Sequence, residues 1–127
     1  MKHVFSPEAP APVGPYSQAT IHQGVAYLSG QVPLDPETGE LRGSSIAEQA
    51  VQVLSNLEEV LRASGSDWDQ VLRVGVYLID LGEFQRFNEV YARVLGDARP
   101  ARSTIQVAAL PLGARVEIDA LAVVDSD

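Results

Sequence analysis

Arg102 and Glu117 are the two charged side chains best placed for chemistry, because each lies in a segment that is otherwise largely apolar. Both belong to RPARSTIQVAALPLGARVEIDALAV, residues 99–123, a pattern typical of two closing strands of a sheet. Charged groups beside water-excluding neighbours are costly unless they pair or react. A guanidinium fork can hold the carboxylate of a small acid, and a partly dry carboxylate can move a proton to or from water. A structural ion pair and a solvated strand end are the alternatives that the pattern leaves open.

Other polar side chains could line a pocket. Tyr16 follows the turn-forming pair Gly-Pro, where its phenol could donate to a ligand or cover a core edge. Asn88 lies on the apolar stripe of a predicted helix, so its amide must either fasten a backbone or face a pocket. Ser29 and Gly30 end a predicted strand, and glycine there would let a ligand approach the backbone or would only serve a turn.

The elements that must position these residues follow from periodicity. Ser45 and Glu48 have capping-box spacing and Gly65 marks an end, which predicts a helix over 46–63. A second helix is predicted over about 82–95, with Asp80 and Glu83 at its start. Strands are predicted from β-branched and aromatic content and from turn residues, over 18–23, 25–32, 71–79, 102–108 and 115–124. The proline-rich start predicts an extended or looping entry.

The order of these elements predicts an α+β domain over residues 1–127, with both helices on one face of the sheet. The last strand is apolar on both faces, except for Glu117 and Asp119 at its start. A strand of this kind needs cover on both sides, and the two helices cover only one. We therefore predict that a second copy of the chain covers the other face.

Composition excludes several classes of function. The chain has no cysteine, which removes thiol nucleophiles, disulfides and thiolate metal sites. His3 and His22 lack metal-ligand spacing, and no Walker loop or dinucleotide fingerprint is present, so we expect no metal and no cofactor. The net charge of −8 disfavours nucleic acid. Lys2, the single lysine, is expected near a loose terminus. No segment has signal-peptide or membrane-span character, so we expect a soluble cytoplasmic protein.

The chain resembles the RidA/YjgF family of small imine deaminases from end to end. The resemblance rests on GPYSQA at 14–19, YLSGQVPLDPETGEL at 27–41, FNEVYARVL at 87–95 and PARSTIQVAALPLGARVEIDALAV at 100–123. The last block is the most specific because it joins a PARS element to a VEIDA strand. The resemblance implies a chorismate-mutase-like α+β fold assembled as a homotrimer, with active sites in the clefts between subunits.

The resemblance also implies an activity, the hydrolysis of reactive 2-imino and enamine acids to 2-oxo acids and ammonia. Arg102 matches the arginine that binds the substrate carboxylate, and Glu117 matches the glutamate that activates water. The implied substrate-binding residues are Tyr16, Ser29, Gly30, Asn88 and Thr104. Thr104 stands where many members have cysteine, at a position that contributes a backbone carbonyl. Leu112 and Gly113 replace the Lys-Asp pair common in this loop, so loop electrostatics should differ.

Three alternatives remain at this stage. The chain could act on another small enamine or on a larger aromatic imine, a choice that depends on the pocket lining. It could be a ribonuclease or translation inhibitor, a role attached to some relatives, although the acidic charge and the lack of a basic patch argue against RNA. It could also be a ligand-binding trimer without catalysis, although a pure carboxylate binder would not require Glu117.

Overall fold

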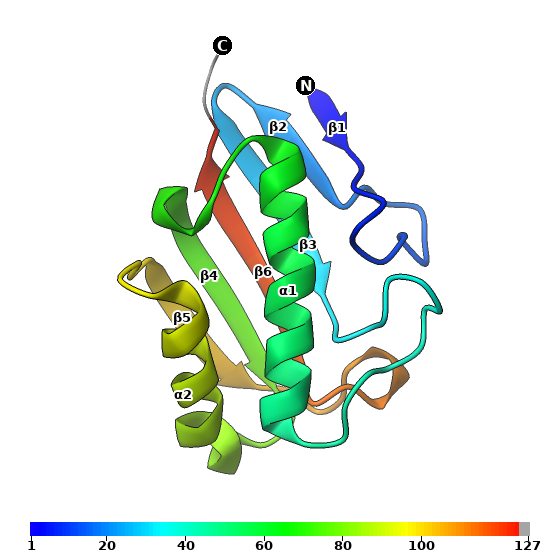
Figure 1. Ribbon diagram of the computed structural model, residues 1–127, viewed down its shortest axis with the longest axis vertical. Coiled ribbons are helices and arrows are strands. Elements are labelled where there is room, and N and C mark those ends of the chain that lie inside the picture. The colour runs from blue at the N-terminus through cyan, green and yellow to red at the C-terminus, as the bar shows by residue number, and fades with distance from the viewer. Residues whose placement is uncertain (125–127) are drawn as a thin grey trace.

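A six-stranded mixed sheet carries both long helices on one face in the computed structural model, which describes residues 1–124 (Figure 1). Its strand order is β1-β2-β3-β6-β4-β5, and only β4 and β5 pair in parallel. The strands are β1 (Lys2–Val4), β2 (Ala19–His22), β3 (Val25–Gln31), β4 (Val71–Leu78), β5 (Ala101–Gln106) and β6 (Val116–Val123). The helices are α1 (Ile46–Ser64) and α2 (Phe84–Leu95). The predicted α+β class, with both helices on one face, is confirmed.

The first helix begins and ends as its sequence predicts. The Ser45 hydroxyl accepts from the Glu48 N–H, and the Glu48 carboxylate accepts from the Ser45 N–H, so the capping box is complete. Gly65 ends α1 in a left-handed conformation with φ 84°. The apolar stripe of α1 packs on β3 and β6 to form the core, whose fully buried members include Val53, Leu54, Leu57, Val60 and Leu61.

Two predictions were wrong, the loose terminus at Lys2 and the Asp80–Glu83 cap of the second helix. Residues Lys2–Val4 form strand β1, paired antiparallel with β2, and Lys2 lies opposite Ile21 rather than in a loose terminus. The second helix starts at Phe84, after a separate 3-10 turn over Leu81–Glu83. Asp80 caps that turn by accepting from the Gly82 N–H, whereas Glu83 pairs with Arg115 instead of closing a capping box.

Strand bounds differ from the predicted ranges by one or two residues at most ends, as expected when strand ends are read from propensity. The turn around Gly24 is the tight hairpin that the sequence indicates, since Gln23 and Gly24 both have positive φ. Residues 125–127 of the predicted domain lie outside the described residues. Within residues 1–124, no helix is both long and apolar enough to cross a membrane.

The face of the sheet opposite the helices is open. On β6, Val116, Ile118, Ala120 and Ala122 are buried toward the helices, while the alternate residues face the other way. Neighbouring strands add apolar side chains to the open face, among them Tyr27 at 48% and Ile105 at 49% exposure. This face combines exposed apolar side chains with the acids Glu117 and Asp119, and no helix covers it (Figure 1).

Candidate active site

Glu117 lies on the open face of the sheet, where β3 contains a bulge. The register of β3 against β6 shifts between Leu28 and Gln31, so β3 has one residue more than β6 there, and Ser29 and Gly30 fall in this bulge. A side-chain carbon at Gly30 would overlap the Glu117 carboxylate. The missing side chain of Gly30 is therefore what lets the carboxylate lie against the β3 backbone.

A hollow of about 580 Å³ opens beside this carboxylate. Tyr16, Ser29 and Gly30, all predicted site residues, line it together with Glu117. The Ser29 hydroxyl donates to the Ser17 carbonyl at 2.7 Å, which fixes its position at the pocket wall. The other lining residues are apolar: Val13, Val32, Leu34, Pro111 and Leu112. The structure thus gathers four predicted residues around one largely apolar pocket.

The environment of Glu117 favours its protonated form. Burial raises the pKa of the Glu117 carboxyl above its ordinary value, and the negative charge of Asp119 raises it further. A carboxyl whose pKa lies closer to neutrality is a better proton donor and acceptor at physiological pH. This shift suits a group that exchanges protons with water.

The raised pKa of Glu117 also makes a prediction about stability. The protonated Glu117 carboxyl adds to the free energy of unfolding below the ordinary carboxyl pKa, and this contribution is lost as pH rises through the raised pKa of the folded protein. Glu117→Gln, which mimics the protonated form, should therefore raise the melting temperature at neutral pH, with the gain disappearing at acidic pH. Thermal unfolding at both pH values and one fixed protein concentration measures this. A variant less stable than wild type at neutral pH would contradict it.

Arg102 lies elsewhere, on edge strand β5 beneath α2. Its guanidinium is 4.6 Å from the centroid of the Tyr91 ring, and the rings of Phe84 and Phe87 lie at 5.6 and 5.9 Å. One terminal nitrogen donates to the Asn88 Oδ1 atom at 2.8 Å. Asn88 therefore orients the guanidinium.

The guanidinium of Arg102 has no acid partner among the described residues. Within residues 1–124 it forms no salt bridge, so the structural ion pair that the sequence allowed is absent there. Its hollow, about 290 Å³, is also lined by Arg99, but Arg99 donates to the carbonyls of Gly96 and Ala98 at the end of α2. Arg102 is thus available to an anionic ligand.

Within one protomer, Arg102 and Glu117 lie on opposite faces of the sheet. Arg102 pairs with Val74, which is buried on the helix side, and Thr104 pairs with the equally buried Val76. Glu117 of β6 is the cross-strand partner of Tyr77 of β4, and both side chains are on the open face. The predicted residues therefore form two groups. Arg102 and Thr104 lie on β5, next to Asn88 of α2. Tyr16, Ser29, Gly30 and Glu117 line the hollow on the open face. A single chain does not join them.

The sequence alone did not reveal two features, the aromatic rings that contact the Arg102 guanidinium and the left-handed, exposed Leu112 in the loop before β6. Phe84, Phe87 and Tyr91 have ordinary helical core spacing, so only the arginine on the neighbouring strand reveals their second role. Leu112 has left-handed φ of 59° and is 63% exposed at the Glu117 hollow. A strained, exposed leucine is an unusual feature, and its departure from the Lys-Asp pattern was the available signal.

Comparison with known proteins identifies the family. The family model for endoribonuclease L-PSP matches residues 6–124. The chain belongs to this family. Protein DfrA of Myxococcus xanthus is 51% identical over 124 residues, covering 96% of this chain and 95% of DfrA. A Mus musculus protein named 2-iminobutanoate/2-iminopropanoate deaminase is 46% identical over 122 residues, covering 96% of this chain and 90% of its own.

The fold agrees with solved members of the family. RidA from the Antarctic bacterium Psychrobacter sp. superposes with a TM-score of 0.93 at 41% identity, over 98% of this chain and 100% of its own. The predicted membership of the RidA/YjgF family is thereby confirmed. The family carries both a ribonuclease description and relatives named as deaminases.

Proposed function

We propose that this family member is a cytoplasmic homotrimeric enzyme, each chain forming one RidA-like domain over 1–127, that hydrolyses reactive 2-imino and enamine acids. Its substrates would include 2-aminoacrylate and 2-iminobutanoate, and its products a 2-oxo acid and ammonia. The observation that carries the proposal is that Arg102, which has no acid partner in the described residues, and Glu117, whose pKa is raised by burial, each lie beside a hollow. The deaminase name of the mouse relative supports the same reaction class.

The two half-sites would meet between protomers. Arg102 lies on β5, an edge strand of the sheet, and Glu117 lies on the face that the helices leave open. The Arg102 edge of one chain would therefore approach the Glu117 hollow of another. Exposed apolar side chains on the open face, such as Tyr27 and Ile105, favour its burial against another copy. A cyclic arrangement would repeat the same complete site at each interface.

The proposed reaction needs few groups. Arg102 would hold the substrate carboxylate with parallel hydrogen bonds, and Tyr16, Ser29, Gly30, Asn88 and the Thr104 backbone would line the cleft. Ionised Glu117 would take a proton from water as the water oxygen bonds to C2 of the imine, and would pass this proton to nitrogen to give a carbinolamine. Glu117 would then take the carbinolamine hydroxyl proton and deliver it to nitrogen as the C–N bond breaks and the C=O bond forms, releasing ammonia and the 2-oxo acid. Since an imine already hydrolyses in water, acceleration by about a hundredfold to ten-thousandfold is enough.

Direct assay tests the proposal. 2-Iminopropanoate or 2-iminobutanoate is generated in situ, and its decay to the oxo acid is followed with and without the protein. We expect faster decay with wild type. No acceleration would contradict catalysis and would favour a ligand-binding trimer that keeps the cleft.

The split site makes a prediction about mixed oligomers. Arg102→Ala and Glu117→Gln chains, each inactive alone, are co-expressed with different tags and the mixed oligomers are purified. If each site takes its arginine and its glutamate from different chains, one of the three sites in every mixed trimer regains both groups. We therefore expect activity near one third of wild type. If both groups came from one chain, no site would be intact and no activity would return.

RNA cleavage is the second candidate, because the matching family model is described as an endoribonuclease. The net charge of −8 disfavours binding to a phosphate backbone. Protein purified through high salt should therefore leave RNA intact. Cleavage that survives this purification and disappears in Arg102→Ala would favour the ribonuclease instead.

A further inference from the structure

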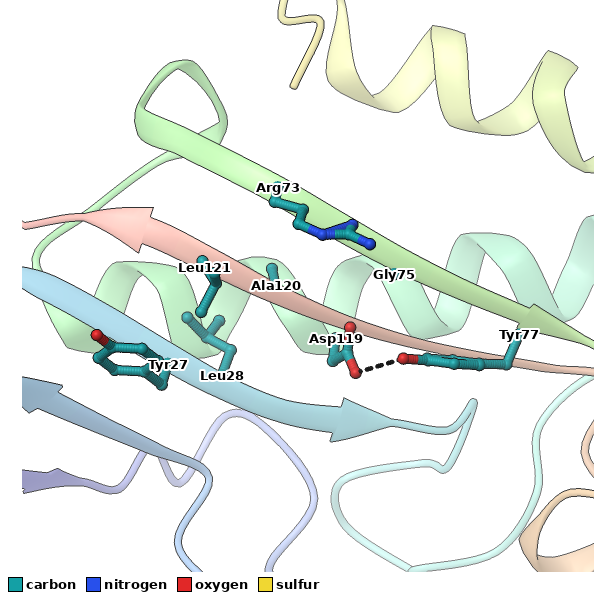
Figure 2. Close-up of a pocket in the computed structure, with 8 residues that line it drawn as sticks. All are labelled: Tyr27, Leu28, Arg73, Gly75, Tyr77, Asp119, Ala120 and Leu121. Atoms are coloured by element: carbon teal, nitrogen blue, oxygen red, sulfur yellow. Dashed lines mark hydrogen bonds between the residues drawn. The ribbon is translucent and has the colours of Figure 1, made fainter. Parts of the chain in front are cut away.

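A tyrosine–aspartate pair lies next to Glu117 on the open face of the sheet. Tyr77 of β4 is the direct cross-strand partner of Glu117, yet its hydroxyl donates to the Asp119 Oδ2 atom at 2.9 Å (Figure 2). Asp119 lies two residues after Glu117 on the same face of β6. The hydrogen bond therefore holds a second carboxylate beside the proposed proton-transfer group.

A glycine, Gly75, lies beneath the Tyr77–Asp119 pair. Gly75 is the cross-strand partner of Asp119, and a side-chain carbon at Gly75 would overlap the Asp119 carboxylate and lie 3.0 Å from the Tyr77 hydroxyl. Figure 2 shows the Asp119 carboxylate and the Tyr77 hydroxyl meeting beside β6, with Gly75 on the adjacent strand β4. The side-chain-free position at Gly75 repeats the arrangement at Gly30, where missing side-chain atoms make room for Glu117. Each acid of β6 thus lies over a glycine on a neighbouring strand.

The Asp119 carboxylate has no cationic partner in the part of the chain that the structure describes. Arg73 lines the same hollow of about 260 Å³, but it donates to the Ser103 hydroxyl at 3.0 Å. Within residues 1–124, Asp119 forms no salt bridge. The titratable and charged groups that surround the two acids on this face are Tyr16, Tyr27, Arg73 and Tyr77.

We propose that Asp119, held by Tyr77 above Gly75, is a positioning residue that controls the protonation of Glu117. The proposal rests on the proposed role of Glu117 in imine hydrolysis and deepens it. Asp119 lines the hollow on the Arg73 side, while Glu117 lines the hollow that contains Tyr16 and Ser29. Asp119 would therefore act on the reaction through Glu117 and not by touching the substrate.

The electrostatics agree with this geometry. Two carboxylates on one face repel each other's charge, so an ionised Asp119 favours the protonated form of Glu117. Burial and then the charge of Asp119 raise the pKa of Glu117. The hydrogen bond to Asp119 is the main cause that raises the pKa of Tyr77, which keeps that phenol in its donating form. Tyr77 is thus held as a neutral hydrogen-bond donor to the Asp119 carboxylate.

The first experiment follows the titration of the Glu117 side-chain carboxyl by carbon NMR in the intact protein. In Asp119→Asn, which keeps the shape and can still accept from Tyr77, the midpoint should move to lower pH. Asp119→Ala should move it in the same direction, because the removed charge and not the side-chain shape is responsible. Tyr27→Phe is the matched control, since it removes a hydroxyl from the same hollow without touching this hydrogen bond, and its midpoint should equal that of wild type. An unchanged Glu117 midpoint in both Asp119 variants would overturn the proposal.

The second experiment compares kcat/KM against pH for wild type and Asp119→Asn. The acidic limb, where Glu117 becomes ionised, should move to lower pH in the variant. The plateau value of kcat/KM in Asp119→Asn should fall much less than the drop of about a hundredfold or more that is expected when the proton-transfer group itself is removed. A limb that stays in place would overturn the proposal while leaving imine hydrolysis intact. If wild type does not hydrolyse imines, the proposed function fails, and the NMR titration still decides whether Asp119 controls Glu117.

Discussion

Arg102→Ala is expected to lower kcat/KM for imine hydrolysis by about a thousandfold, because truncating one partner of a desolvated, hydrogen-bonded charge pair costs about 2–5 kcal/mol. The guanidinium lies over the Tyr91 ring and donates one hydrogen bond to Asn88, while its other N–H groups have no acid partner in the described residues. Arg102→Lys should recover little of the loss, since an ammonium cannot make two parallel bonds to a carboxylate. Steady-state kinetics with the in-situ imine measure both variants.

Arg86→Ala is the matched control for this experiment. Arg86 is an exposed arginine of the same region, on α2, and it pairs with Glu89 at 3.0 Å on the helix surface. An exposed pair of this kind contributes little to stability, and Arg86 does not line the Arg102 hollow. We expect near wild-type kcat/KM. Equal losses in Arg86→Ala and Arg102→Ala would show that Arg102 has no specific role.

Glu117→Gln is expected to lower kcat by about a hundredfold to ten-thousandfold, the usual contribution of a positioned proton-transfer group. The amide keeps the shape of the carboxylate over Gly30 but cannot take a proton from water. The substrate carboxylate would still bind to Arg102, so KM should change much less than kcat. Single-turnover kinetics separate the chemical step from binding.

An exposed acid supplies the control for Glu117. Glu89→Gln removes one negative charge from the surface of α2, so it reproduces the change in net charge without changing the hollow. Its kcat should match that of wild type. Full activity in Glu117→Gln would remove the proton-transfer role and would leave Arg102 as part of a binding site only.

The elements that sequence predicts well are those with several local signals. Helix α1 has an apolar stripe, a capping box at Ser45 and a left-handed glycine at Gly65, and all three agree. Strand β1 has three residues followed by a proline-rich segment, so it carries no periodic signal. It forms because Lys2–Val4 can extend the sheet beside β2. Tertiary pairing, which propensity does not contain, produces this strand.

The candidate site shows the same limit. Sequence pattern singled out Arg102 and Glu117 as charges in apolar surroundings, and the resemblance to a family gave them roles that remain a proposal. Neither source says which face of the sheet each side chain occupies within one chain. That outcome depends on β6 lying between β3 and β4 while β5 pairs in parallel at the edge. The Tyr77–Asp119 pair was equally hidden, because the residues are 42 positions apart and meet only through strand register.

The opposite-facing placement of Arg102 and Glu117 means that an isolated chain, however well folded, cannot present both groups to one small molecule. Catalysis would then require assembly of several copies of the chain. A newly synthesised or highly diluted chain would be inactive until it associated with other copies, so the dissociation constant of the oligomer would set the protein concentration at which turnover begins.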